Sequence, residues 1–407
     1  MNRKTLLILV GAIVVIILGI GIYFWLNSYT SNQPPVSGSP FGSGGGNSPT
    51  TNNQQPTSNQ NASQSTSNTV VSSSGLRKIA DGPISGATIF ARASTTIVRY
   101  VDKATGNIYE YDTGTNATTR ISNTTMPKIE EVSWGNNGNA LVMRFLKDSA
   151  IESYFGTLSA STTATAGSLA QLVGNYLPEN INSLSFSPLR DKIFYTLPST
   201  VGIEAFVADK NGGNPKSVWQ FATTEWMSQW VTENSLTLTT KASNGISGSA
   251  FSLNLKTGSF FPSLSNVPGL TTLTSPDGNL ILYSQSQGSI TSLNLYDGKN
   301  NQTEDMPFIT LPEKCLWGNT TTLFCAVPNS GMDSYLPDTW YQGFVSFGDT
   351  IWKGTMSGTK TPSNTANNIS NMDGNSIDAI KLALSPDGKT LIFENKKDYS
   401  LWLLPLQ

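Results

Sequence analysis

The sequence predicts an all-β fold, a β-propeller of seven four-stranded blades, preceded by an N-terminal transmembrane helix. Three observations lead to this prediction: an uncharged apolar run at the N-terminus, a turn that recurs between apolar runs, and units of about 47 residues that repeat through residues 76–407. With 407 residues, of which 38% are hydrophobic, the chain can bury a full core.

The composition excludes several classes of function. There is no histidine, which excludes triads with an imidazole base and histidine-ligated metal sites. The 25 basic and 27 acidic residues are balanced, so no cationic field attracts nucleic acid. No cofactor, metal site or catalytic constellation is found. The sequence therefore predicts that the chain is not an enzyme.

The first 26 residues predict the compartment. Residues 1–4 form a cytoplasmic stub with Arg3 and Lys4, and residues 5–26 are an uncharged apolar run. At about 1.5 Å per residue, a helix over this run reaches roughly 33 Å, enough to cross a hydrocarbon core of about 30 Å. The positive charges before it hold the N-terminus in the cytoplasm. A cleaved signal peptide is the alternative, but its apolar region would be shorter and followed by small residues.

Residues 27–75 are predicted to be a disordered linker. They contain no charged residue and consist mostly of Ser, Thr, Asn, Gln, Gly and Pro. Such a segment buries too little apolar surface to offset its ordering entropy, and it spans roughly 35–40 Å on average. The prediction is a single-pass membrane protein whose domain, residues 76–407, lies outside the cytoplasmic membrane, in the cell envelope.

A short turn recurs between two apolar runs in this domain. Its full form, Ser-Pro-Asp-Gly, is found as Ser275, Pro276, Asp277 and Gly278 and again as Ser385, Pro386, Asp387 and Gly388. Weaker copies lie at residues 134–139 and 186–192. Proline presets one turn position, aspartate bonds the neighbouring backbone, and glycine takes the left-handed conformation. Each copy is therefore predicted to join two antiparallel strands.

Each hairpin is followed by a third alternating run and, after a polar turn, by a fourth, which is typical of strands rather than helices. The first strands of the units are expected near Ala87, Glu130, Asn182, Met227, Leu270, Lys314 and Asp378. Seven such units match the blades of a propeller, and six blades are the alternative. The last unit has three strands, so residues 76–80 are predicted to complete it and remove an exposed edge.

The Ser-Pro-Asp-Gly turn followed by an apolar strand resembles the TolB-type, WD40-like repeat of bacterial propellers, which is also found in propeller domains of some prolyl peptidases. The resemblance covers most of residues 76–407, but only the turns at 275–278 and 385–388 match fully. It implies a binding or scaffolding module of the cell envelope, without catalysis by the propeller. The chain differs from TolB in its membrane anchor, its long linker and the lack of an obvious α/β domain, so no particular partner is implied.

Cys315 and Cys325 are the two cysteines of the chain, and they flank a predicted hairpin. Folding it about Thr320 places them opposite each other, where Cβ atoms about 4.5–5.5 Å apart can close to the roughly 3.8 Å of a disulfide. Such a bond persists outside the cytoplasm. Two buried free thiols are the alternative. A metal site is not expected, because two thiolates supply half a zinc shell.

The largest insertion, residues 328–350, lies in the sixth unit between its second and third strands. The candidate partner-binding residues are Tyr335, Asp338, Trp340, Tyr341 and Phe344. This connection lies on the face that propellers usually use for ligands, and rigid aromatic side chains dominate binding hot spots. The alternative is that these rings fold back onto the channel or a neighbouring blade.

The leading functional hypothesis is an anchored, extracytoplasmic module that binds another envelope or surface protein. The alternative is a histidine-free, carbohydrate-active enzyme or a carbohydrate-binding or adhesive surface protein.

Overall fold

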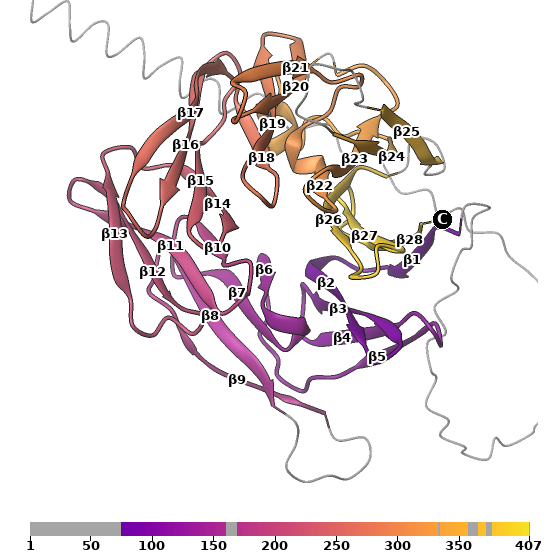
Figure 1. The fold of residues 1–407 in the computed structure, drawn as a ribbon. Coiled ribbons are helices and arrows are strands. Elements are labelled where there is room, and N and C mark those ends of the chain that lie inside the picture. The colour runs from indigo at the N-terminus through magenta and orange to yellow at the C-terminus, as the bar shows by residue number, and fades with distance from the viewer. Residues whose placement is uncertain (1–74, 160–168, 333, 357–364, 372–376, 407) are drawn as a thin grey trace, which may run out of the picture. The chain divides into compact units, whose positions relative to one another are not determined.

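The computed structural model describes residues 75–159, 169–332, 334–356, 365–371 and 377–406. In these ranges, 28 strands form seven antiparallel four-stranded sheets, arranged as blades around a centre (Figure 1). The predicted all-β propeller with seven blades is confirmed. No helix in the described ranges is long and apolar enough to span a membrane. The predicted span at 5–26 and the linker up to residue 74 lie outside these ranges.

Each blade is a meander whose strands follow one another from the centre outward (Figure 1). Blade 1 contains β2 (Ile84–Arg92), β3 (Thr95–Asp102), β4 (Ile108–Asp112) and β5 (Ala117–Arg120). Blade 2 contains β6 (Glu131–Trp134), β7 (Ala140–Lys147), β8 (Ala150–Ser159) and β9 (Gln171–Tyr176). Blade 3 contains β10 (Leu184–Phe186), β11 (Lys192–Ser199), β12 (Gly202–Asp209) and β13 (Lys216–Phe221).

The next three blades repeat this order. Blade 4 contains β14 (Trp226–Thr232), β15 (Ser235–Thr240), β16 (Ser247–Asn254) and β17 (Phe260–Pro268). Blade 5 contains β18 (Thr271–Thr274), β19 (Leu280–Gln287), β20 (Ile290–Asp297) and β21 (Gln302–Asp305). Blade 6 contains β22 (Cys315–Trp317), β23 (Thr322–Pro328), β24 (Asp349–Thr355) and β25 (Thr365–Asn371). The seven predicted first strands all fall within or next to the innermost strands.

Blade 7 joins the two ends of the described chain. It contains β26 (Ala379–Leu384), β27 (Thr390–Asn395), β28 (Leu401–Pro405) and, as its outermost strand, β1 (Arg77–Ala80). β1 is antiparallel to β28, with Arg77 opposite Leu403. The prediction that residues 76–80 complete the last blade is confirmed. Pairing β1 with β28 closes the ring and covers the edge of β28.

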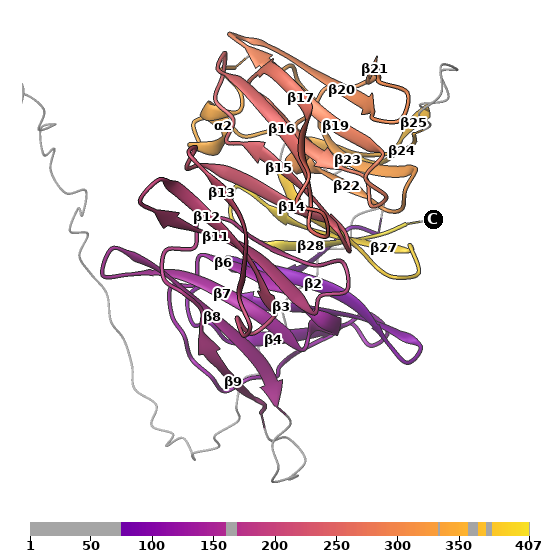
Figure 2. The same cartoon turned by 60° about the vertical axis from the view of Figure 1, so that its left-hand side comes forward.

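The two faces of the ring carry different loops. We call the face with the loops between second and third strands the insertion face, because it carries the insertion after β23. The opposite face, which carries the turns between first and second strands, is the turn face. Figure 2 shows α2 (Asp338–Tyr341), the helix of the insertion, at one of these two ends of the ring.

The recurring turns follow the predicted chemistry. Gly278 and Gly388 have φ angles of 76° and 71°, in the left-handed region. Ser275 Oγ donates to Asp277 Oδ1 at 2.6 Å and accepts a hydrogen bond from the Leu280 backbone at 3.0 Å. These bonds hold each first strand against its second, so a local sequence signal sets the register of the blade.

The core lies between neighbouring blades rather than at one centre. Seven buried apolar clusters each join the facing sides of two adjacent blades. The cluster between blades 6 and 7 contains Leu76, which is 1% exposed, with Leu391, Phe393 and Leu404. The residue before β1 therefore contributes to the core as well as to ring closure.

We expect Leu76→Ala to lower the free energy of unfolding by about 2–5 kcal/mol, because it leaves a cavity between blades 6 and 7. The measurement is urea-induced unfolding followed by tryptophan fluorescence. The control is Leu146→Ala, because Leu146 is 64% exposed and this change should cost less than about 0.5 kcal/mol. Equal unfolding midpoints for the two variants would show that residue 76 does not help to close the ring.

Candidate functional site

The insertion between β23 and β24 has a small core of its own. Leu336, Trp340 and Phe347 form a buried cluster with Leu311 and Met332. Trp340 is 3% exposed and Leu336 is fully buried. The insertion is therefore a packed part of the propeller, and its remaining side chains are held on a defined backbone.

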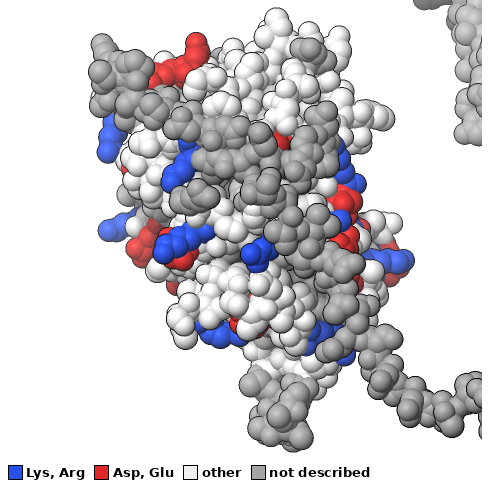
Figure 3. Space-filling model, turned by 90° about the vertical axis from the view of Figure 1, so that its right-hand side faces the viewer, with Lys and Arg blue, Asp and Glu red and all other residues white. Residues whose placement is uncertain are grey.

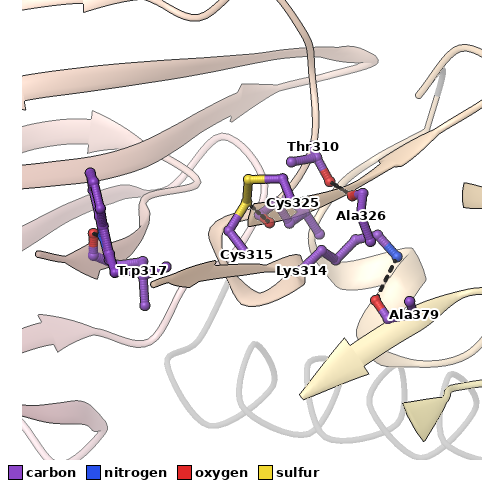
Figure 4. Close-up of a disulfide and its surroundings, with 9 residues drawn as sticks. Thr310, Lys314, Cys315, Trp317, Cys325, Ala326 and Ala379 are labelled. Atoms are coloured by element: carbon purple, nitrogen blue, oxygen red, sulfur yellow. Dashed lines mark hydrogen bonds between the residues drawn. A yellow bond between two sulfur atoms is a disulfide. The ribbon is translucent and has the colours of Figure 1, made fainter. Parts of the chain in front are cut away.

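A buried lysine lies beneath this cluster. Lys314, the last residue of the short helix η2 (Pro312–Lys314), is fully buried. Its Nζ donates to Asp349 Oδ2 at 2.7 Å and to Asp378. It also donates to the Ala379 carbonyl at 3.2 Å, the bond that Figure 4 draws. A buried ammonium group requires hydrogen bonds and opposite charges of this kind, because its transfer from water into the protein interior costs several kcal/mol.

The two aspartates that bind Lys314 also link the insertion to blade 7. Asp378 Oδ2 accepts hydrogen bonds from Trp340 Nε1 at 2.9 Å and from the Phe347 backbone at 3.0 Å. Asp349 Oδ2 accepts one from the Ala379 backbone at 2.7 Å. Burial raises the pKa of Asp349 to about 6, although the Lys314 ammonium acts in the opposite direction. This charge cluster joins blades 6 and 7 to the insertion.

The disulfide lies next to the charge cluster. Cys315 and Cys325 face each other across β22 and β23, and their sulfur atoms are bonded at 2.08 Å (Figure 4). Cys315 directly follows Lys314 in the chain, and both sulfur-bearing residues are buried. The cross-link therefore joins the first two strands of blade 6 beside the base of the insertion.

Asn244, in the loop between β15 and β16, connects the insertion to blades 4 and 5. Its Nδ2 donates to the Leu336 and Gly288 carbonyls, both at 2.9 Å. Its backbone N–H donates to Asp338 Oδ2 at 2.6 Å. Sequence reasoning missed this residue, because nothing distinguishes it among the many asparagines of the chain.

The five predicted binding residues have different environments. Tyr335 and Phe344 are 63% and 79% exposed, and Tyr341 is 38% exposed. Trp340 is buried against the charge cluster and cannot present its ring to a partner. Asp338 is partly buried and holds the insertion against Asn244. Both sequence-based readings of the insertion therefore describe part of it, since some rings pack inward and others face solvent.

Tyr341 also borders a cavity of about 390 Å³ on the insertion face. The other lining residues are Ile151, Asn182, Thr224, Glu225, Trp226, Met227 and Lys241. The Tyr341 hydroxyl donates to Glu313, and burial raises the pKa of the Glu313 carboxyl. The cavity thus combines aromatic rings with the exposed ion pair of Lys241 and Glu225, and the half-buried Glu313 lies behind Tyr341, outside the lining.

Most of the exposed large apolar side chains in the described ranges lie at the insertion face. Besides the insertion itself, they are Leu146, Tyr176, Val201, Met227, Ile246, Ile290, Ile309 and Tyr399. Charge does not gather by sign in the same way, since basic and acidic side chains are interspersed on the side of the ring drawn in Figure 3. The insertion face is distinguished by its exposed apolar groups.

Comparisons with known proteins extend the fold assignment. No family model and no curated protein matches the sequence. Among solved structures, the chain is similar to an oligogalacturonate lyase in complex with manganese, with a TM-score of 0.54 and 11% identity over 84% of this chain and 96% of that one. A puromycin-hydrolyzing peptidase from Mycobacterium tuberculosis gives a TM-score of 0.46 and 11% identity over 77% of this chain. The match spans 52% of that peptidase.

The prediction that the chain is not an enzyme is wrong. A solved structure that shares its propeller fold is a lyase, so this architecture gives no reason to exclude catalysis. At 11% identity the likeness establishes the fold alone, and it transfers no catalytic residue to this chain. Within the ranges that the structure describes, no three cysteine or acidic side chains gather in a way that could hold a metal ion.

The raised pKa of Asp349 predicts a pH-dependent contribution to stability. In the folded state it is about 6, above the roughly 3.9 of an unfolded chain. This group therefore adds stability as the pH falls through that interval, because the folded state binds its proton more tightly. Asp349→Asn removes this titration, so the stability of wild type relative to the variant should increase from about pH 7 to about pH 5.

Urea unfolding midpoints at a series of pH values measure this difference. Asp148→Asn is the control for the loss of one carboxylate, because Asp148 is exposed and lies outside the charge cluster. A constant difference between wild type and Asp349→Asn would contradict a raised pKa at this carboxyl.

Proposed function

We propose that the chain is a single-pass membrane protein whose propeller lies outside the cytoplasmic membrane and binds another envelope protein through the insertion face. One observation carries the proposal: Tyr335 and Phe344 are exposed on a segment that a buried charge cluster and Asn244 hold in place. Exposed aromatic rings on a rigid support are what a protein-binding hot spot requires.

The energetics favour binding at this position. Binding is weakened when side chains and loops must become ordered in the complex, because their loss of conformational entropy is unfavourable. Here the backbone of the insertion is already held by Trp340, Asp378 and Asn244, so little ordering is left for the complex. The neighbouring Ile246 and Ile290 are 64% and 75% exposed. Their loops adjoin the insertion through Asn244 and Gly288, and grouped apolar side chains of this kind mark interaction surfaces.

Two observations support the proposed compartment. The Cys315–Cys325 disulfide is a bond that persists in oxidising compartments and is rare in the cytosol. The apolar run at 5–26 is long enough to anchor the chain. The resemblance to the TolB-type repeat agrees with a place in the cell envelope.

The test uses a membrane-impermeant, lysine-reactive crosslinker on intact cells, followed by purification of the chain and mass spectrometry of its adducts. We expect one dominant envelope protein. The double variant Tyr335→Ser, Phe344→Ser should reduce this adduct at least about tenfold, because it removes two aromatic contacts.

Leu189→Ser is the matched control, since Leu189 is 71% exposed in a loop on the opposite, turn face. It should leave the adduct unchanged. An equal loss in this control would place the partner elsewhere. Adducts that form only with a membrane-permeant reagent would place the propeller inside the cell.

A second candidate function, action on a carbohydrate, is favoured by the cavity beside Tyr341. Trp226 and Tyr341 both line it, and the Tyr341 hydroxyl donates to Glu313, a half-buried acid behind the cavity wall. A carboxyl group with a raised pKa is suited to general acid–base catalysis. One solved structure of similar fold is described as an oligogalacturonate lyase, which makes oligogalacturonate the first substrate to test.

For this candidate, Tyr341→Phe should lower the rate of oligogalacturonate cleavage by about 10²-fold or more, because it removes the hydroxyl bonded to Glu313. The increase in reducing ends measures the rate. Tyr335→Phe is the control, because Tyr335 is exposed on the same insertion but does not line this cavity. Unchanged cleavage by Tyr341→Phe, or none by wild type, would exclude this function.

A further inference from the structure

The turn face opens into two cavities that share lining residues. Their volumes are about 660 and 370 Å³, and both are lined by Arg190, Leu316 and Trp317. Arg190 comes from blade 3, whereas Leu316 and Trp317 come from β22, the innermost strand of blade 6. The two cavities therefore meet near the centre of the ring, and their volumes lie in the range of small-molecule sites, about 300–1,000 Å³.

Arg190 occupies a backbone position at which a large side chain is disfavoured. Its φ is 59°. In the turn at 186–192 it occupies the position that Gly278 and Gly388 occupy in the two Ser-Pro-Asp-Gly turns. Left-handed backbone is uncommon for residues other than glycine, asparagine and aspartate. The turn keeps its other bonds, because Ser187 Oγ donates to Asp191 Oδ1 at 2.7 Å. The closure of the turn gives no reason for an arginine here, so any role of its side chain lies outside the turn.

The guanidinium of Arg190 has no acidic partner among the residues that the structure describes. Within the described ranges it forms no salt bridge, and its one hydrogen bond is donated by Nη1 to the Trp134 carbonyl at 2.7 Å. Its Cζ lies 6.0 Å from the centre of the Phe186 ring. Arg190 as a residue is exposed, but the protein atoms around its guanidinium lower its pKa by desolvation, and no neighbouring carboxylate opposes this shift. Since a guanidinium has five N–H donors, most of its donors are left for a ligand or water.

Taken together with Arg190, the lining carries a net positive charge, because the charges of Lys353 and Asp387 cancel. Besides Arg190, the charged side chains of the larger cavity are those of Lys353 and Asp387, and the smaller cavity has no other charged residue. The Asp387 carboxylate already accepts hydrogen bonds from Ser385 Oγ and the Lys389 backbone. The cavities therefore favour an anion over a cation.

The uncharged lining is suited to a ligand with both a ring and hydroxyl groups. Trp230 and Trp317 supply aromatic surface, and Ser185, Ser228 and Thr274 supply polar groups. A largely apolar wall with a few polar groups is typical of sites for small molecules.

We propose that the turn-face end of the central channel binds a small molecule that carries a carboxylate, and that Arg190 binds this carboxylate. The planar guanidinium can pair with both oxygens of a carboxylate at once. Sugar acids and aromatic acids share this chemistry, and the hydroxyl groups of the lining favour a sugar acid. The site lies on the face opposite the insertion, so it does not depend on the proposed partner.

The experiment is calorimetric titration of the full-length chain in detergent with sodium glucuronate, and with glucose, which has the same ring but no carboxylate. We expect glucuronate to bind and glucose not to bind. Sodium benzoate tests whether the site prefers a sugar acid to an aromatic acid. If benzoate binds as tightly as glucuronate, the site is one for carboxylates in general. If benzoate binds more weakly, the site is one for sugar acids. Failure of both carboxylates to bind wild type would overturn the proposal.

Two variants separate binding from folding. Arg190→Gly introduces the residue found at this position in the two Ser-Pro-Asp-Gly turns, so it should leave the thermal unfolding midpoint unchanged or raise it. The same variant should weaken glucuronate binding at least about tenfold. Arg190→Asn, whose side chain tolerates left-handed backbone, should give the same loss of binding. If both variants bind glucuronate as wild type does, the proposal is wrong.

Lys128→Gly is the matched control. Lys128 is an exposed basic residue with a φ of 62°, and it lies in the loop between β5 and β6, away from both cavities. It should bind glucuronate as wild type does. An equal loss of binding in this control would mean that overall charge, rather than Arg190, accounts for the binding, and would overturn the proposal.

Discussion

The pairing of β1 with β28 is the interaction on which the rest of the structure depends. A propeller blade buries its two faces only against its neighbours, and each of the seven apolar clusters spans two blades. An open ring would leave one blade face and one strand edge in water. Because β1 comes from the start of the described chain and β28 from its end, closure links contacts that are far apart in sequence. The contribution of every blade interface therefore depends on this one strand pair.

Within the closed ring, the buried Lys314 has an analogous role for the insertion. It is separated from Asp349 by 35 residues and from Asp378 by 64, and through them it holds Trp340 and the backbone of Phe347. Buried ion groups of this kind need not increase net stability. Their effect here is to define one conformation for a segment that lacks strand pairing of its own, which leaves Tyr335 and Phe344 exposed on a fixed support.

The fold could be predicted from the sequence because its signals are local. Ser275 to Gly278 and Ser385 to Gly388 specify turns through contacts over a few residues, and alternating runs identify the strands on either side. Ring closure could be predicted from the number of strands in each unit, since the last unit has only three and residues 76–80 supply the fourth. The facing positions of Cys315 and Cys325 could also be predicted from the sequence, because the hairpin between them determines which residues lie opposite each other.

The candidate sites depend on contacts that no local pattern encodes. The exposures of Trp340 and Phe344, 3% and 79%, differ because one ring meets Asp378 from another blade and the other does not. Asn244 joins three blades with bonds to residues 44 and 92 positions away. Arg190 looked like an imperfect turn residue, and its importance emerged only when blades 3 and 6 placed it in a shared cavity. Catalysis was excluded too readily, because the absence of histidine removes certain mechanisms but not an activity.

The direction of β1 has a mechanical consequence. Arg77, at its start, pairs with Leu403 near the end of β28, and Gly75 lies against Pro405, so β1 begins at the turn face. In the proposed anchored arrangement, a partner held at the insertion face would pull against the anchor roughly along β1. Such a load acts on all the hydrogen bonds between β1 and β28 together, in shear, rather than breaking them one after another. The strand that closes the ring would then also be the strand that transmits force between the membrane and the bound partner.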